Sequence, residues 1–269
     1  MDTRYPSRIV CLTEEPTEVL YALGEQRRIV GISGFTVRPA GVRGEKPRVS
    51  AFTSAKIDKI LALKPDLAIG FSDLQADIAR ELIRHGIEVW ISNHRTVEGI
   101  LGYVRRLGAM VGAFEAAERY AQRLEQNLER LRAAAAALPR SPRVYFEEWD
   151  EPLISGIAWV SELIAVAGGV DVFPERAVCS LAKDRIIADA LEVVRAQPDV
   201  ILGSWCGKRF RPERVATRVG WGDIPAVRSG ELHEIKSPEI LQPGPAALTD
   251  GVTRMHEIFA RWAARAQPA

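Results

Sequence analysis

Cysteines are few in this sequence, and none of them lies close to another. Among 269 residues there are three, Cys11, Cys179 and Cys206, and no CxxC motif. A zinc ribbon needs closely spaced thiolates, and a small disulfide-stabilised domain needs paired ones. Neither class is indicated, so the fold must rely on an ordinary hydrophobic core.

The sequence also lacks an excess of charge and a long apolar run. The formal net charge is +1 and no extended basic stretch occurs, so electrostatic capture of nucleic acid has no support. No segment approaches the roughly 20 apolar residues that cross a bilayer. Hydrophobic residues at 47% and charged residues at 26% are typical of a globular protein with a sizeable core.

The start of the sequence shows no export signal. Met1–Pro6 leads almost directly into a strand-like apolar segment, without the basic start, apolar run and cleavage site of a secretory signal. Two interpretations follow, a mature exported form with an added methionine or a protein that stays in the cytoplasm.

Enzyme signatures are missing as well. The sequence has no GxSxG nucleophile elbow, no GxxxxGK[ST] phosphate loop, no HExxH and no GxGxxG. The turn after the first predicted strand, Thr13–Pro16, holds two glutamates that would repel a pyrophosphate. These absences favour a binding protein over an enzyme.

Short apolar runs alternate with amphipathic stretches, which is typical of α/β proteins with parallel strands. Strands are predicted at 9–12, 29–32, 67–70, 88–91, 144–147, 200–203 and 232–235. Helices are predicted at 16–23, 57–63, 74–85, 96–110, 159–167, 188–196 and 245–264.

One segment, 113–138, has neither glycine nor proline and places its apolar residues on a single helical face. Pro139 and Pro142 then end the helix. A rod of roughly 37 Å is long enough to join two lobes, 1–112 and 139–269. The alternative is a long surface helix within one domain.

An internal repeat supports two lobes. Residues 61–70 resemble 193–202, since each segment reads as a helix end, a Pro-Asp turn and a buried strand. Arg8 and Arg143 begin similar strands at nearly the same spacing. A repeated layout of this kind indicates two related halves.

Ligands of α/β sheets bind beyond the carboxyl ends of the strands, so the residues after each predicted strand are the candidates for binding. Aromatic rings in these loops offer flat surfaces for a large planar or cage-like ligand, although packing in the core is the alternative for each. The candidate rings are Phe35, Phe52, Phe71, Trp149 and Trp205. The candidate polar contacts are Glu14, Glu15, Glu148, Arg209 and Ser237.

Two residues are candidate metal ligands. His94 follows a predicted strand and carries an imidazole. Cys206 follows another, and the neighbouring Lys208 and Arg209 would lower the pKa of its thiol. Neither belongs to a local ligand motif, so the alternative for both is a structural or exposed side chain.

Several segments together form a pattern that is typical of one known family, and they are distributed over nearly the whole chain. These segments are 8–12, 16–18, 24, 30–33, 56–67, 159–164, 167–169, 173, 197–201 and 242–245. In them the sequence resembles the helical-backbone metal receptors among the substrate-binding proteins of ABC transporters, and the vitamin B12-binding members most of all.

The resemblance implies a class III periplasmic binding protein, with two Rossmann-like α/β/α lobes joined by one backbone helix. It implies a monomer, periplasmic or at the cell surface, that holds a metal complex between its lobes and uses no catalytic cofactor. It also implies acidic contacts to the membrane permease. Asp77 occupies the matching position in the first lobe, and Glu192 lies beside the matching position, Leu191, in the second.

One departure weakens the corrinoid assignment. Where the vitamin B12 receptors have a tryptophan near Arg185, this sequence has Cys179–Asp184. A siderophore or haem ligand is therefore an alternative, as is a cytoplasmic corrinoid or tetrapyrrole carrier. A two-domain enzyme resembling a glycosyltransferase is a further rival, and it would need a phosphate-binding loop that the sequence lacks.

Overall fold

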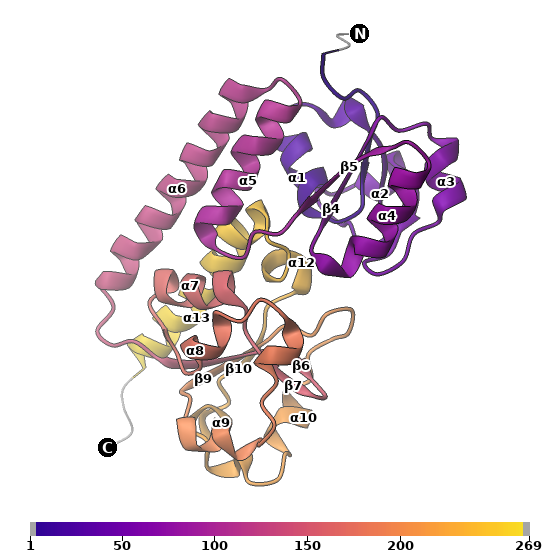
Figure 1. The fold of residues 1–269 in the computed structure, drawn as a ribbon. Coiled ribbons are helices and arrows are strands. Elements are labelled where there is room, and N and C mark those ends of the chain that lie inside the picture. The colour runs from indigo at the N-terminus through magenta and orange to yellow at the C-terminus, as the bar shows by residue number, and fades with distance from the viewer. Residues whose placement is uncertain (1–3, 266–269) are drawn as a thin grey trace. The chain divides into compact units, whose positions relative to one another are not determined.

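The computed structural model describes residues 4–265, which form two compact α/β units (Figure 1). The first unit comprises the chain up to His94 together with Glu98–Glu125, and the second comprises Arg95–Val97 and the chain from Gln126 onward. Each unit is built on its own sheet.

The first unit has a parallel sheet in the order β3-β2-β1-β4-β5. The strands are β1 (Ile9–Cys11), β2 (Ile29–Ser33), β3 (Arg48–Ser50), β4 (Leu67–Phe71) and β5 (Glu88–Ser92). Its helices are α1 (Glu15–Ala22), α2 (Val42–Glu45), α3 (Ile57–Ala62), α4 (Ala76–Arg84) and α5 (Val97–Met110), with 3-10 turns at Gln26–Arg28 and Asp73–Gln75. The central strand β1 is wholly buried, as the inner strand of a parallel sheet must be.

The second unit has a sheet in the order β10-β9-β6-β7, and β8 pairs with β6 as well. The strands are β6 (Arg143–Asp150), β7 (Leu153–Ser155), β8 (Val170–Asp171), β9 (Val200–Gly203) and β10 (Leu232–Glu234). The helices are α7 (Ala158–Ala167), α8 (Pro174–Ala177), α9 (Leu191–Ala196), α10 (Pro212–Ala216), α11 (Pro225–Ser229), α12 (Ser237–Ile240) and α13 (Val252–Ala264), with 3-10 turns at Ala182–Arg185 and Trp221–Asp223. The short hairpin of β6 and β7 is antiparallel, and β6 pairs in parallel with β8 and β9.

The predicted long helix is present as α6 (Phe114–Ala136), and the division between the two units falls within it. Its buried residues, among them Ala117, Leu124 and Leu131, recur every three or four positions and form one apolar face. The observed helix is shorter than 113–138 because its last residues form a turn ahead of Pro139. The helix predicted at 245–264 is present over that range, with a π-helical turn (Ala247–Gly251) within it directly before α13.

The repeated Pro-Asp segments form the same clasp in both units. In the first unit the Asp66 carboxylate accepts hydrogen bonds from the backbone N–H groups of Ser7 (2.7 Å) and Arg8 (2.9 Å). The Arg8 guanidinium donates back to the carbonyls of Leu63 (2.6 Å) and Lys64 (3.0 Å). The start of β1 is thereby tied to the turn that precedes β4.

In the second unit Asp199 and Arg143 repeat these contacts. The Asp199 carboxylate accepts from the backbone N–H of Arg143 (2.8 Å), and the Arg143 guanidinium donates to the carbonyl of Ala196 (2.9 Å). Lys64 and Gln197, each just before its Pro-Asp pair, have left-handed backbones with φ of 47° and 44°. Two non-glycine residues in that sparsely populated region at equivalent places confirm the internal repeat.

Replacing the clasp carboxylate is expected to destabilise the protein. Burial alone would raise the pKa of Asp66, but hydrogen bonds from Ser7 and Arg8 outweigh burial and hold the pKa below its usual value. Asp66→Asn should lower the free energy of unfolding by roughly 1–2 kcal/mol at pH 7. A carboxyl group with a lowered pKa stabilises above its unfolded pKa of about 3.9 and loses that effect as the pH falls through the folded pKa. The difference should therefore shrink between pH 5 and pH 3.

Urea unfolding at each pH measures this difference, and Glu129→Gln, an exposed position on α6, is the control. Asp199→Asn should show a loss of similar size in the second unit. A loss for Asp66→Asn no larger than that of the control would contradict the clasp.

Candidate functional site

A buried glutamine organises the loops at the carboxyl ends of the first sheet. Gln75 donates to the carbonyls of Leu12 (3.3 Å) and Phe52 (2.9 Å), and it accepts from the backbone N–H of Phe71 (3.0 Å). The loops after β1, β3 and β4 are thus held together by one side chain. The sequence analysis missed Gln75, because it belongs to no motif. The one signal that could have found it is its position shortly after the strand β4.

Two glutamates follow β1 at the start of α1, and both are buried. Burial, and then the nearby Glu15 and Glu18, raise the pKa of Glu14 to about 8. Burial also raises the pKa of Glu15 to about 7, although Thr13 donates a hydrogen bond of 2.6 Å to its carboxylate. The other oxygen of Glu15 is buried without a hydrogen-bond partner among the described residues. Near neutral pH Glu14 is therefore mostly protonated and Glu15 is protonated in part, so each can donate as well as accept.

The three predicted phenylalanines of the first unit differ in how exposed they are. Phe35, after β2, is 44% exposed, and Phe52 is half-buried. Phe71 is only 4% exposed, and its ring lies edge-on to His94 at 5.4 Å. Phe35 and Phe52 are therefore accessible to a ligand, whereas Phe71 packs in the unit.

His94 is half-buried after β5 and is held on several sides. Its ring stacks on Tyr103 with 4.7 Å between centroids, and its Nδ1 lies 2.6 Å from the Ser92 hydroxyl. Among the described residues no three histidine, cysteine, aspartate or glutamate side chains are grouped to hold a metal ion. Metal ligation by His94, or by the exposed Cys206, stays a prediction.

A hollow of about 550 Å³ lies beside α4, at the carboxyl ends of β4 and β5. Its walls are mostly apolar and include Ala79, Ile83 and Ile91, with Asn93 at the end of β5. The position agrees with the general place of ligands in parallel sheets.

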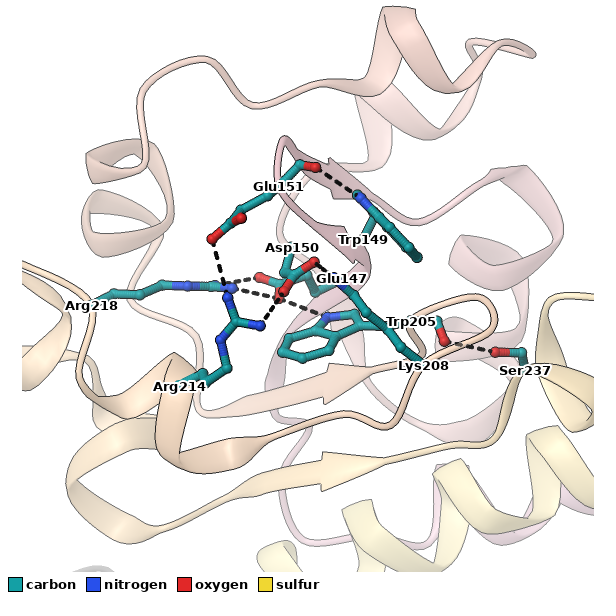
Figure 2. A network of polar contacts seen from close by, with 9 residues as sticks. All are labelled: Glu147, Trp149, Asp150, Glu151, Trp205, Lys208, Arg214, Arg218 and Ser237. Atoms are coloured by element: carbon teal, nitrogen blue, oxygen red, sulfur yellow. Dashed lines mark hydrogen bonds and ion pairs between the residues drawn. The ribbon is translucent and has the colours of Figure 1, made fainter.

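In the second unit a buried ion pair supports Trp205. Glu147, at 0% exposure in β6, receives two hydrogen bonds from the Arg218 guanidinium (2.5 and 2.8 Å) and one from Trp205 Nε1 (3.0 Å) (Figure 2). Trp205 is 2% exposed and packs edge-on against Phe210, with 5.1 Å between centroids. The Phe210 ring occupies the space that a Cβ at Gly203 would take. The prediction that Trp205 offers a ring face to a ligand does not fit this packing, because the ring lies in the core.

A second group of charges lies at the end of β6. The carboxylate of Asp150, with 2% exposure, is ion-paired with Lys208 and lies 3.4 Å from Arg214, which also contacts Glu151 at 3.2 Å. The Lys208 ammonium lies 4.1 Å from the centroid of the Trp149 ring and 5.1 Å from that of Trp205. Trp149 is only partly buried, so it keeps an accessible surface.

The remaining predicted residues have different surroundings. Glu148 pairs with the buried Arg185 at 2.6 Å, and Ser237 donates to the carbonyl of Trp205 at 3.2 Å. Arg209 is exposed. The sequence analysis did not predict that Lys208, Arg214 and Arg218 support the site. The signal for it was the group of acids at the end of β6 together with the several cations that follow β9.

The sequence matches the profile of the family described as "Periplasmic binding protein" over residues 9–239. A vitamin B12-binding protein of Vibrio parahaemolyticus is 24% identical over 245 residues, which are 90% of this chain and 85% of that protein. An ABC transporter substrate-binding lipoprotein of Bacillus subtilis, described as uncharacterised, is 22% identical over 261 residues, which are 94% and 79% of the two chains.

Solved structures with the same fold include two periplasmic proteins. The vitamin B12 binding protein of Vibrio cholerae has a TM-score of 0.75 at 24% identity, covering 97% of this chain and 99% of that one. A heme-binding protein from Roseiflexus sp. RS-1 has a TM-score of 0.82 at 22% identity, covering 96% and 99%. The fold predicted from the resemblance is therefore confirmed. In residues 4–265 none of the helices is both long enough and apolar enough to traverse a bilayer.

The buried glutamates should make stability depend on pH. A carboxyl group whose pKa is raised on folding stabilises below its unfolded pKa of about 4.3, and this effect is lost as the pH rises through the folded pKa. For Glu15 the loss falls between about pH 4.3 and its folded pKa of about 7. Glu15→Gln should therefore reduce the fall in unfolding free energy from pH 5 to pH 8.5 by about 2 kcal/mol.

Urea unfolding at the two pH values measures this change, with Glu88→Gln at an exposed position as the control. Equal pH dependence in wild type and Glu15→Gln would show that Glu15 is ionised in the folded protein throughout.

Proposed function

We propose that this chain, which belongs to the periplasmic binding protein family, captures a corrinoid or a related metal complex for uptake by an ABC-type transporter. The family consists of binding proteins for transport rather than enzymes. A corrinoid is placed first because several relatives that align with most of this chain are named vitamin B12-binding proteins. Siderophores and haem are the alternatives.

The observation that carries the proposal is an accessible aromatic ring at the carboxyl end of each sheet. Phe35 provides one in the first unit and Trp149 the other in the second. A corrin or porphyrin presents a broad apolar face around its metal, and stacking on such rings removes that face from water. Phe52 adds a half-buried ring, whereas Phe71 and Trp205 are buried and pack beneath the accessible residues.

Polar groups in the loops at the carboxyl ends of the two sheets suit a ligand with many amide groups. A protonated Glu14 can donate to an amide oxygen, and its ionised form can accept from an amide N–H. Arg209 adds donors in the second unit. Glu15, Glu148 and Ser237 contribute less directly, because each already has a partner within the protein.

Titration with cyanocobalamin, haemin and a ferric siderophore tests the proposal, with tryptophan fluorescence and visible absorbance as readouts. We expect saturable binding of cyanocobalamin. Trp149→Ala should weaken it by about 30-fold, the effect of losing a central aromatic contact. Phe114→Ala is the matched control, since Phe114 is 65% exposed on α6 and lies outside the carboxyl-end loops.

The possible results have distinct meanings. Binding of haemin or the siderophore alone would replace the corrinoid while leaving the metal-complex class intact. Failure of all three ligands would refute the proposed function. Fractionation of the native cells separates uptake from the alternative of a cytoplasmic carrier, since a receptor would be found outside the inner membrane.

Asp77 is the better placed of the two predicted permease contacts. Its carboxylate is 88% exposed on α4 and lies 2.9 Å from Arg80. Glu192 is less accessible, because it pairs with Arg176 at 2.6 Å within the second unit. A partner arginine can therefore reach Asp77 more easily.

Asp77→Ala should reduce transport several-fold in vesicles that contain the cognate permease and leave ligand affinity unchanged, since exposed charges steer docking. Asp58→Ala, an exposed acid on α3, is the control. Transport by Asp77→Ala at the wild-type rate would exclude this residue as a permease contact.

A further inference from the structure

A lysine side chain reaches between two tryptophan rings in the second unit. The Lys208 ammonium lies 4.1 Å from the centroid of Trp149 and 5.1 Å from that of Trp205 (Figure 2). An ammonium over the face of an indole is attracted by the negative potential of the ring. One positive charge therefore bridges the accessible ring and the buried one.

The inner side of this bridge is firmly held. Lys208 is ion-paired with the buried carboxylate of Asp150, and the Trp205 indole donates to Glu147 at 3.0 Å. Glu147 is held in turn by two hydrogen bonds from Arg218. The Lys208 side chain is 36% exposed, but its charge-assisted bond to the buried Asp150 carboxylate fixes the position of the ammonium.

The outer side of the bridge is Trp149. Its indole N–H donates to the carbonyl of Glu151 at 2.8 Å, within the β6–β7 hairpin. Lys208 belongs to a different element, the loop between β9 and α10. The ring is therefore held at one edge by its own hairpin and over one face by a cation from a neighbouring loop.

We infer that Lys208 is a positioning residue, which fixes the orientation of Trp149 and covers one of its faces, so that a flat conjugated ligand stacks on the opposite side only. Fixing the ring before the ligand arrives lowers the entropic cost of binding. The role in ligand binding rests on the proposed function, whereas the orientation of the ring can be measured without ligand.

The ligand-free test compares Lys208→Met, which keeps the chain length, with Lys208→Arg, which keeps the charge. The fluorescence and circular dichroism signals of Trp149 are obtained by subtracting, for each protein, the spectrum of the same protein carrying Trp149→Phe. In Lys208→Met we expect acrylamide, an uncharged quencher, to quench the Trp149 fluorescence about twofold more strongly and the near-ultraviolet circular dichroism of Trp149 to weaken, since the cation–π contact is lost. Lys208→Arg should restore both signals.

The ligand test is a double-mutant cycle with cyanocobalamin. Lys208→Met alone should weaken binding by about tenfold, and it should have little effect once Trp149 is phenylalanine. Lys59→Met, an exposed lysine on α3, is the control. Thermal unfolding confirms that each variant is folded. If Lys208→Met is destabilised because the buried Asp150 carboxylate has lost its nearest cation, the double variant Lys208→Met/Asp150→Asn takes its place.

Each outcome decides the inference. Unchanged Trp149 signals in folded Lys208→Met would overturn it, whatever the ligand result. An equal loss of affinity with and without Trp149 would also overturn it, because Lys208 would then act on the ligand directly. If wild type binds none of the three metal complexes, the proposed function fails, and the ligand-free signals alone decide whether Lys208 positions Trp149.

Discussion

The carboxylate of each Pro-Asp turn sets the frame on which both units depend. Asp66 and Asp199 each accept a hydrogen bond from the backbone at the start of a central strand, and an arginine from that strand returns the contact to the turn. The clasp fixes where β1 lies along β4 and where β6 lies along β9. In parallel sheets the register at the amino ends determines which residues emerge at the carboxyl ends, where ligands bind. A contact far from the site thus decides which side chains the site can use.

The two carboxyl ends that this frame produces differ in their electrostatics. In the second unit the buried acids Glu147 and Asp150 each have a basic partner. In the first unit Glu14 and Glu15 are buried next to one another, and the resulting rise in their pKa values keeps Glu14 mostly protonated and Glu15 partly protonated near neutral pH. The second unit therefore supplies a rigid support for a ring, and the first supplies hydrogen-bonding groups without a fixed charge. A ligand with a flat apolar face and amide groups at its rim suits both.

Periodicity and repetition in the sequence were enough to predict the sheets, the long helix and the duplication, because these features depend on local patterns of burial. The short strands β3, β7 and β8 were missed, since each has at most two apolar residues in a row and so forms no apolar run like that of β1. The direction of loop side chains was also beyond reach. Trp149 and Trp205 both follow strands in polar segments, yet the first is accessible and the second is in the core. The two tryptophans differ in their partners, because the Trp205 indole donates a hydrogen bond to the fully buried Glu147 carboxylate. A contact between residues so far apart in the sequence leaves no local signal.

The burial of Trp205 makes the site depend on residues that touch no ligand. The accessible ring of Trp149 lies against Lys208, Lys208 lies against Trp205, and Trp205 is bonded to Glu147, which Arg218 holds. Because Glu147 is fully buried, removing Arg218 would leave an unpaired charge in the core, and the disturbance would pass outward to the ring. Under the proposed function, ligand recognition in this unit would depend on a chain of contacts that begins at a buried ion pair, and residues of the core would belong to the site together with the exposed ring.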